Sequence, residues 1–158
     1  SLALLEWSET SHLTLKRGPY VIAAGLDETD DLPVKTIEGS FVDLFSATLE
    51  VRSAVKLSPG TRALLLDLHK LDRSHPLVLA SASKVLGIEV KDGMLRFHSE
   101  GPEGTTCATR IALPSEAKSA TADGKPVRMR WDAETRTVLL TYDNSPDGRW
   151  VEVTWEEC

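Results

Sequence analysis

An acidic loop is the first part of this sequence whose residue types could do chemistry. Asp27, Glu28, Asp30 and Asp31 place four carboxylates within five positions. Calcium prefers about six to eight oxygen ligands from carboxylates, carbonyls and water, so the loop is a candidate calcium site. The spacing lacks the turn glycine and the final glutamate of an EF-hand loop, and a solvated loop is therefore the favoured interpretation.

Trp150 is the candidate ligand-binding residue among the four tryptophans. Side chains alternate across a strand, and Trp150 falls on the parity opposite to Trp155, which belongs to the apolar face of its strand. An exposed indole can stack on a sugar ring, pack against another domain or be an ordinary partly buried residue. Trp131 and Trp155 are expected in the core, and Trp7 lies close to the first residue.

Three residues of the central loop could bind a transition metal. His69, Asp72 and His75 combine two imidazoles with a carboxylate, but their spacing matches no common ligand pattern. The favoured interpretation is a polar loop without a metal. His12 and His98 stand alone on expected strands, where no partner is visible.

The sequence contains no serine in the motif that exposes the catalytic nucleophile of many hydrolases. Ser81 and Ser83 alternate with alanines in an expected strand and lack the Gly-x-Ser-x-Gly turn. No pair stands out among the 24 acidic residues as the acid and base of a glycosidase. Cys107 and Cys158 are too few for a disulfide framework or a metal cluster. We expect no catalytic residue and no cofactor, apart from the calcium alternative.

Length, composition and net charge narrow the classes of protein to which this chain can belong. The chain has 158 residues, of which 41% are hydrophobic and 27% are charged, and this composition is typical of a single globular domain. We expect this domain to be a fragment of a larger protein. The polar stretch 67–76 is where a seam between two lobes would lie. A net charge of -6 argues against a nucleic-acid partner. No apolar run reaches the roughly 18 to 20 residues that cross a membrane.

The elements that position these residues are expected to be strands. Apolar residues alternate in 127–131, 137–142 and 151–155, with compact turns between them, which predicts a meander of three strands. Asp92-Gly93 and Asp123-Gly124 are favoured two-residue hairpin turns.

The first half follows the same pattern. Strands are expected near 12–16, 20–26, 34–37, 41–45, 54–57 and 63–68. Turn signals recur about every 8 to 12 residues. Only 77–85, rich in alanine and serine, could be misread as a helix. The sequence therefore predicts an antiparallel β-sandwich of about ten or more short strands with little helix.

Two sets of segments resemble the C-terminal β-sandwich that follows the catalytic barrel of many bacterial glycoside hydrolases. The first set is 17–23, 37–45, 55–60 and 63–67, and the second is 122–131, 137–140 and 151–155. The resemblance implies a non-catalytic accessory domain that packs against or supports the catalytic domain of the same parent chain. It also implies a secreted or periplasmic location.

Two other functions stay open at this point. A carbohydrate-binding module would use an exposed aromatic platform to bind polysaccharide. A protein–protein adhesion or assembly domain would carry a large apolar patch.

Overall fold

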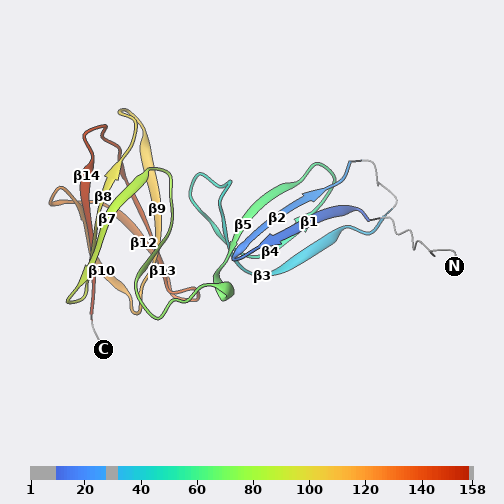
Figure 1. Cartoon of the computed structure of the whole chain (residues 1–158), viewed down its shortest axis with the longest axis horizontal. Helices are drawn as coiled ribbons and strands as arrows, with labels where there is room; N and C mark the ends of the chain where they lie inside the picture. Colours follow the sequence, from blue (N-terminus) through green and yellow to red (C-terminus); the bar gives the residue numbers. More distant parts are fainter. Residues whose placement is uncertain (1–9, 28–31, 157–158) are drawn as a thin grey trace, which may run out of the picture. The chain divides into compact units, whose positions relative to one another are not determined.

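The computed structural model describes residues 10–27 and 32–156 and is built from antiparallel strands (Figure 1). It confirms the prediction of an all-β fold with many short strands and little helix, since its one described helix is the single 3-10 turn η1 (Leu68–Lys70). The strands fall into two compact units. Unit 1 contains residues up to 45 and 51–70, and unit 2 contains residues 46–50 and 71–158. The chain thus enters unit 2 twice, first for the short segment 46–50 and then from residue 71 onward.

Unit 1 is a five-stranded antiparallel sheet with the order β1-β2-β5-β3-β4. Its strands are β1 (His12–Arg17), β2 (Tyr20–Gly25), β3 (Lys35–Asp43), β4 (Val51–Leu57) and β5 (Arg62–Asp67). Two strands expected at 34–37 and 41–45 are one long strand, β3, because a single bulge between Glu38 and Phe41 shifts its register against β4 without ending the pairing.

One face of the unit 1 sheet forms its core. The buried members come from β2, β3, β4 and β5, and Ile37 and Val55 pack against them. They are Val21, Ala23, Phe41, Leu57, Ala63 and Leu65. This face follows directly from the alternation of the sequence, since every second residue of β2 and β5 points into it.

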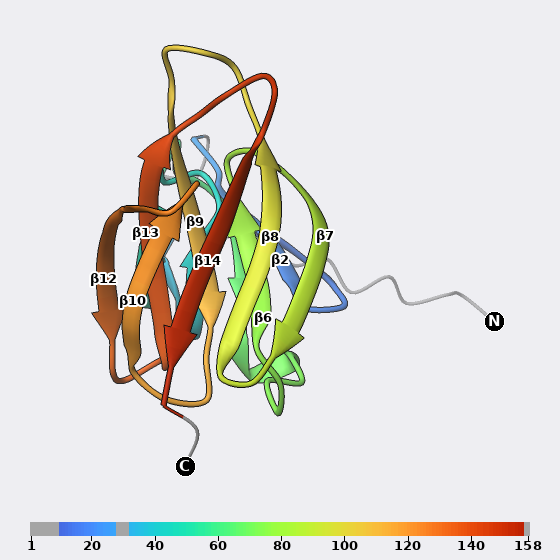
Figure 2. The ribbon, with the colours of Figure 1, turned by 90° about the vertical axis from the view of Figure 1, so that its left-hand side faces the viewer.

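Unit 2 is a sandwich of two antiparallel sheets (Figure 2). One sheet has the order β11-β10-β14-β8-β7 and the other has the order β12-β13-β9-β6. The strands are β6 (Leu77–Ser81), β7 (Lys84–Lys91), β8 (Met94–Glu100), β9 (Thr106–Ala112), β10 (Ala117–Ala122), β11 (Lys125–Pro126), β12 (Arg128–Asp132), β13 (Thr137–Asp143) and β14 (Arg149–Trp155).

Two hairpin turns of unit 2 are those that the Asp-Gly pairs predict. Asp92 and Gly93 join β7 to β8, and Asp123 and Gly124 join β10 to β11. All four residues have positive φ, between 46° and 75°. Positive φ at both central residues is the geometry of a type I′ turn, whose twist matches that of the paired strands.

The core of unit 2 lies between its two sheets. Leu95, Phe97, Val151, Val153 and Trp155 come from the first sheet, and the second contributes the inward residues of β9 and β13. Trp131 packs against this core as a partly buried residue. Met129, which the alternation also assigns to the core side, is 40% exposed because β12 is the edge strand of its sheet.

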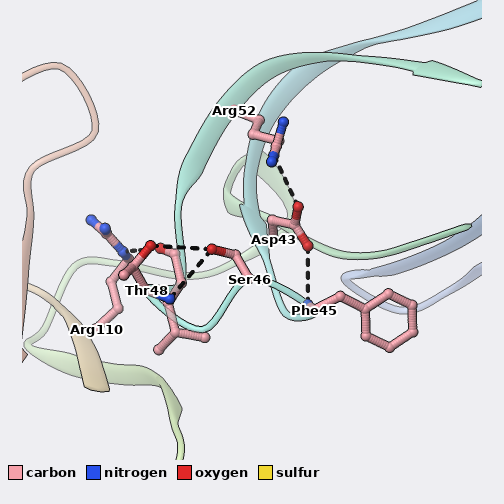
Figure 3. Close-up of polar contacts among 7 residues, drawn as sticks. Asp43, Phe45, Ser46, Thr48, Arg52 and Arg110 are labelled. Carbon is pink, nitrogen blue, oxygen red and sulfur yellow. Dashed lines mark hydrogen bonds and ion pairs between the residues drawn. The ribbon is translucent and has the colours of Figure 1, made fainter. Parts of the chain in front are cut away.

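Polar contacts fix the segment between β3 and β4 (Figure 3). In unit 1, the Asp43 carboxylate accepts a hydrogen bond from the Phe45 amide and forms a 2.9 Å ion pair with Arg52. In unit 2, Arg110 donates from Nε to the Leu49 carbonyl at 2.6 Å.

Candidate functional site

The candidate site lies on the outer face of the β7–β8–β14 part of unit 2. Val151 and Val153 point into the core, so the alternating residues Trp150 and Glu152 point outward. The register places Trp150 opposite His98 and Glu152 opposite Arg96. The strand alternation that predicted Trp150 to be more exposed than Trp155 matches the structure, where their exposed fractions are 39% and 7%.

The indole of Trp150 contacts two side chains of β8, those of Arg96 and His98. The guanidinium carbon of Arg96 lies 4.1 Å from the ring centroid, which is a cation–π distance. The His98 ring lies 5.1 Å from Trp150 at an interplanar angle of 60°. The sequence shows no partner for His98, so this contact is a finding of the structure.

Carboxylates fix both of these neighbours. Glu152 forms a 3.2 Å ion pair with Arg96, and Glu100 lies 3.6 Å from His98 Nδ1. The arrangement combines an apolar ring with charged donors and acceptors. These are the groups that hold the faces and hydroxyls of a sugar.

The backbone of Trp150 is fixed at the start of β14. Its amide donates to Asp123 Oδ1 at 2.9 Å, and Asp123 Oδ2 pairs with Arg149 at 3.2 Å. Asp123 belongs to the turn after β10, so the carboxylate of this turn residue fixes the backbone from which the Trp150 indole projects.

The acidic loop is mostly outside the described residues. Of the four calcium candidates, Asp27 is described, whereas Glu28, Asp30 and Asp31 lie in the gap between residues 27 and 32. Calcium binding by this loop stays a prediction.

The central-loop candidates are not brought together as a metal site. His69 lies 3.9 Å from Asp67, and the Asp72 carboxylate accepts a hydrogen bond from the Ser74 amide, which lowers the pKa of Asp72. Within 10–27 and 32–156, no group of three or more His, Cys, Asp or Glu residues is arranged to hold a metal ion. The same residues contain no helix long and apolar enough to cross a membrane.

Ser81 and Ser83, which are half-buried, belong to a polar cluster that the sequence did not predict. Ser81 bonds to Thr109 at 2.8 Å, Ser83 bonds to Ser99 at 2.6 Å, and both contact the thiol of Cys107. Burial opposes ionisation of the thiol, but the surrounding hydroxyls outweigh it and lower the pKa of Cys107.

Tyr142 closes this cluster. Its hydroxyl donates to Ser99 and bonds with Thr109, each at 2.9 Å. Burial and the contact with Cys107 raise the pKa of Tyr142 to about 12. Because Ser99, Cys107 and Thr109 are buried, the cluster contributes to the packing of the sandwich. Its signal in the sequence was the spacing of Ser81 and Ser83 at the end of β6 and of Cys107 and Thr109 on β9.

A second surface lies on unit 1, on the face of β1 and β2 opposite to its core. The register sets Leu15 beside Ile22 and Leu64, and sets Leu13 beside Ala24. Leu13 and Leu15 are 61% and 60% exposed, and Tyr20 and Ile22 are also exposed. The alternation in 12–16 signals this row, but it does not reveal which face of the strand would be covered.

Comparisons with known proteins found no match: no family model, no curated protein and no solved structure is similar to this chain.

Proposed function

We propose that this chain is a non-catalytic accessory domain of a carbohydrate-active, glycoside hydrolase-like bacterial protein, and that it packs against the catalytic domain of that protein. The observation that supports the proposal is the exposed apolar face of unit 1. Four large apolar side chains on the adjacent strands β1 and β2 are exposed to solvent. They are Leu13, Leu15, Tyr20 and Ile22. Contiguous apolar patches of this kind are typical of surfaces that another protein covers.

Two arginines at the edge of this apolar face indicate which charge the partner surface should carry. Arg17 lies beside Tyr20, and Arg62 lies beside Ala24, so the apolar centre has arginines at two corners. Both arginines are exposed. A complementary partner has an apolar centre with carboxylates at its rim.

Hydroxyl-radical footprinting tests this proposal. Oxidation of Leu15 and Tyr20 is compared between the isolated chain and the longer polypeptide that carries it. We expect these side chains to become protected in the longer polypeptide, while Ile88, which is 52% exposed on β7 of unit 2, keeps its rate. Equal oxidation of Leu15 and Tyr20 in the two samples would contradict the proposal.

A matched pair of variants gives a second readout. Leu15→Gln should reduce the melting temperature of the catalytic domain in the longer polypeptide, because it places a polar amide in the interface. Ile88→Gln should leave that melting temperature unchanged.

The Trp150 face supports a second candidate function, saccharide binding. Its indole is 39% exposed and has Arg96 on the neighbouring strand β8 and Glu152 on its own strand, so it can stack on a sugar ring while these two side chains bond hydroxyls. The test is a glycan array followed by calorimetry against plant and bacterial polysaccharides. Measurements with and without calcium also test the acidic loop.

The control for this test is Met129→Ala. Met129 is 40% exposed, almost the same as Trp150, but lies on the other sheet of unit 2. Saturable binding that Trp150→Ala abolishes and Met129→Ala retains would establish a carbohydrate-binding module. No binding across the panel, or an equal loss in both variants, would exclude this function for Trp150.

A further inference from the structure

β1 lies at the edge of the unit 1 sheet, and the side of it that faces away from β2 is open. Among the strands that the structure describes, β1 pairs with β2 alone. The Leu26 amide donates to the Ser11 carbonyl at 2.9 Å, so the positions that bond to β2 are every second residue from Ser11 onward. The residues between them are His12, Thr14 and Lys16, whose backbone N–H and C=O groups point away from β2. These groups can pair with a further strand.

β1 differs from two other edge strands in features that favour such pairing. β4, at the opposite edge of unit 1, has no large apolar side chain that is exposed. β7 of unit 2 exposes Leu86, Ile88 and Val90, but a bulge after Leu86 interrupts its ladder with β8. Bulges twist an edge away from further pairing. β1 pairs with β2 over all six of its residues without a register shift, and it exposes Leu13 and Leu15.

The two faces of β1 define the pattern of a strand that would pair with it. Leu13 and Leu15 lie on the exposed apolar face of unit 1. His12, Thr14 and Lys16 lie on the other face, because side chains alternate along a strand. Residues that are opposite each other in paired strands share a face. An added strand therefore needs apolar residues beside the leucines and polar residues beside the other three.

The charges of β1 favour acidic residues at those polar positions. Lys16 and Arg17 are exposed, and neither forms an ion pair with a residue that the structure describes. β1 itself contains no carboxylate. A carboxylate opposite Lys16 would be attracted to it, whereas a second copy of β1 would bring more cations without a counter-charge. An acidic strand is therefore a better occupant of this edge than a second copy of the chain.

We propose that the partner domain adds an extended strand along the open edge of β1, and that apolar and acidic residues alternate in this strand. This inference rests on the proposed packing role of unit 1 and specifies how the partner binds there. Backbone hydrogen bonds to His12, Thr14 and Lys16 supply affinity, and the alternating side chains supply specificity. The added strand also extends the apolar row of Leu13 and Leu15.

Residue-resolved hydrogen exchange tests the strand addition. The amides of His12, Thr14 and Lys16 are compared between the isolated chain and the longer polypeptide that carries it. We expect these three amides to exchange about tenfold or more slowly in the longer polypeptide, because each gains a hydrogen bond. The amides of Leu13 and Leu15 bond to β2 in both samples, so their rates should change less.

A proline at the edge tests the backbone hydrogen bonds. Thr14→Pro removes the N–H that faces the partner, at an edge position where proline is tolerated. In the longer polypeptide, this variant should return the exchange of the His12 and Lys16 amides to the rates of the isolated chain. Thr14→Ala keeps the N–H and should keep the protection. Melting curves show whether each variant is folded.

Lys16→Glu tests the charge of the partner strand and serves if Thr14→Pro does not fold. It places a carboxylate against an acidic strand, so the Thr14 amide in the longer polypeptide should exchange about five- to tenfold faster. The control is Lys35→Glu, which makes the same charge change on β3, between β5 and β4. Lys35→Glu should leave the protection unchanged.

Three results would overturn this proposal. One is equal exchange of the edge amides in the two samples. If Leu15 and Tyr20 are still protected from oxidation, the packing role stands and the strand addition alone fails, and if they are not, both proposals fail. Another is that a folded Thr14→Pro variant or Lys16→Glu leaves the protection intact. The third is that sedimentation velocity shows the isolated chain to be a dimer that Thr14→Pro dissociates, which would assign the edge to a second copy.

Discussion

Arg96 covers the indole of Trp150, with its guanidinium carbon 4.1 Å from the ring centroid. The two residues lie on neighbouring strands, two positions apart in the cross-strand register and on the same face, and Glu152 forms an ion pair with the guanidinium from β14. The contact fixes the orientation of an indole that the core does not enclose. The outer face of this sheet is therefore an ordered surface.

The contrast between Trp150 and Trp155 gives the first prediction. Trp155→Ala should reduce the free energy of unfolding by about 3 to 5 kcal/mol, because it leaves a cavity in the core. Trp150→Ala should reduce it by about 1 kcal/mol, since the main loss is the contact with Arg96. Urea unfolding followed by circular dichroism measures both values.

The reverse order of stability would show that the register of β14 is shifted by one residue. Such a shift would exchange the two faces of the strand and bury Trp150 in place of Trp155.

The sequence predicted the strands of this protein because their signals are local. Alternation in 151–155 and the Asp123-Gly124 turn each depend on a few adjacent residues, and the structure has both. Partners distant in sequence gave no local signal. The contact of His98 with Trp150 joins residues 52 positions apart, and Arg110 reaches a carbonyl 61 positions away. The candidate site could be predicted only through Trp150 itself.

Arg110 gives the second prediction. Its side chain is 1% exposed, and it donates to the Leu49 carbonyl at 2.6 Å and to Thr137 Oγ1 at 2.9 Å. Arg110→Met keeps most of the volume but leaves both oxygens without this donor. We expect a loss of about 2 to 4 kcal/mol in the free energy of unfolding.

Arg130→Met is the control for Arg110→Met. Arg130 is exposed on β12, and its replacement should change stability by about 0.5 kcal/mol or less. Similar losses in the two variants would mean that the contacts of Arg110 do not stabilise unit 2.

Tyr142 gives a prediction about pH. Its pKa is raised from 10.0 to about 12, so the folded state holds the phenol proton more tightly than the unfolded state does. This contribution to stability is complete below pH 10 and is lost as the pH rises from about 10 to about 12, up to roughly 2 to 3 kcal/mol. Urea unfolding at a series of pH values measures the loss.

Tyr142→Phe isolates this effect from other groups that titrate at high pH. The variant should be less stable at pH 7, because Ser99 and Thr109 lose a partner, but its stability should fall less steeply between pH 10 and pH 12. Parallel pH curves for the two proteins would show that Tyr142 does not titrate with a raised pKa.

Gly148 gives the last prediction, because its backbone lies against the ring of His98. A Cβ at this position would lie 1.9 Å from a carbon of that ring, and the φ of Gly148 is 80°. Gly148→Ala therefore combines a strained backbone with a displaced imidazole, and it should cost clearly more than the roughly 1 kcal/mol of backbone strain alone. The control is Gly124→Ala, where φ is 75° but no atom lies within 4 Å, so only the strain remains. Because His98 contacts Trp150, Gly148→Ala should also shift the tryptophan fluorescence, whereas Gly124→Ala should not. Equal stabilities and equal spectra for the two variants would mean that His98 moves away without cost and does not hold the indole in position.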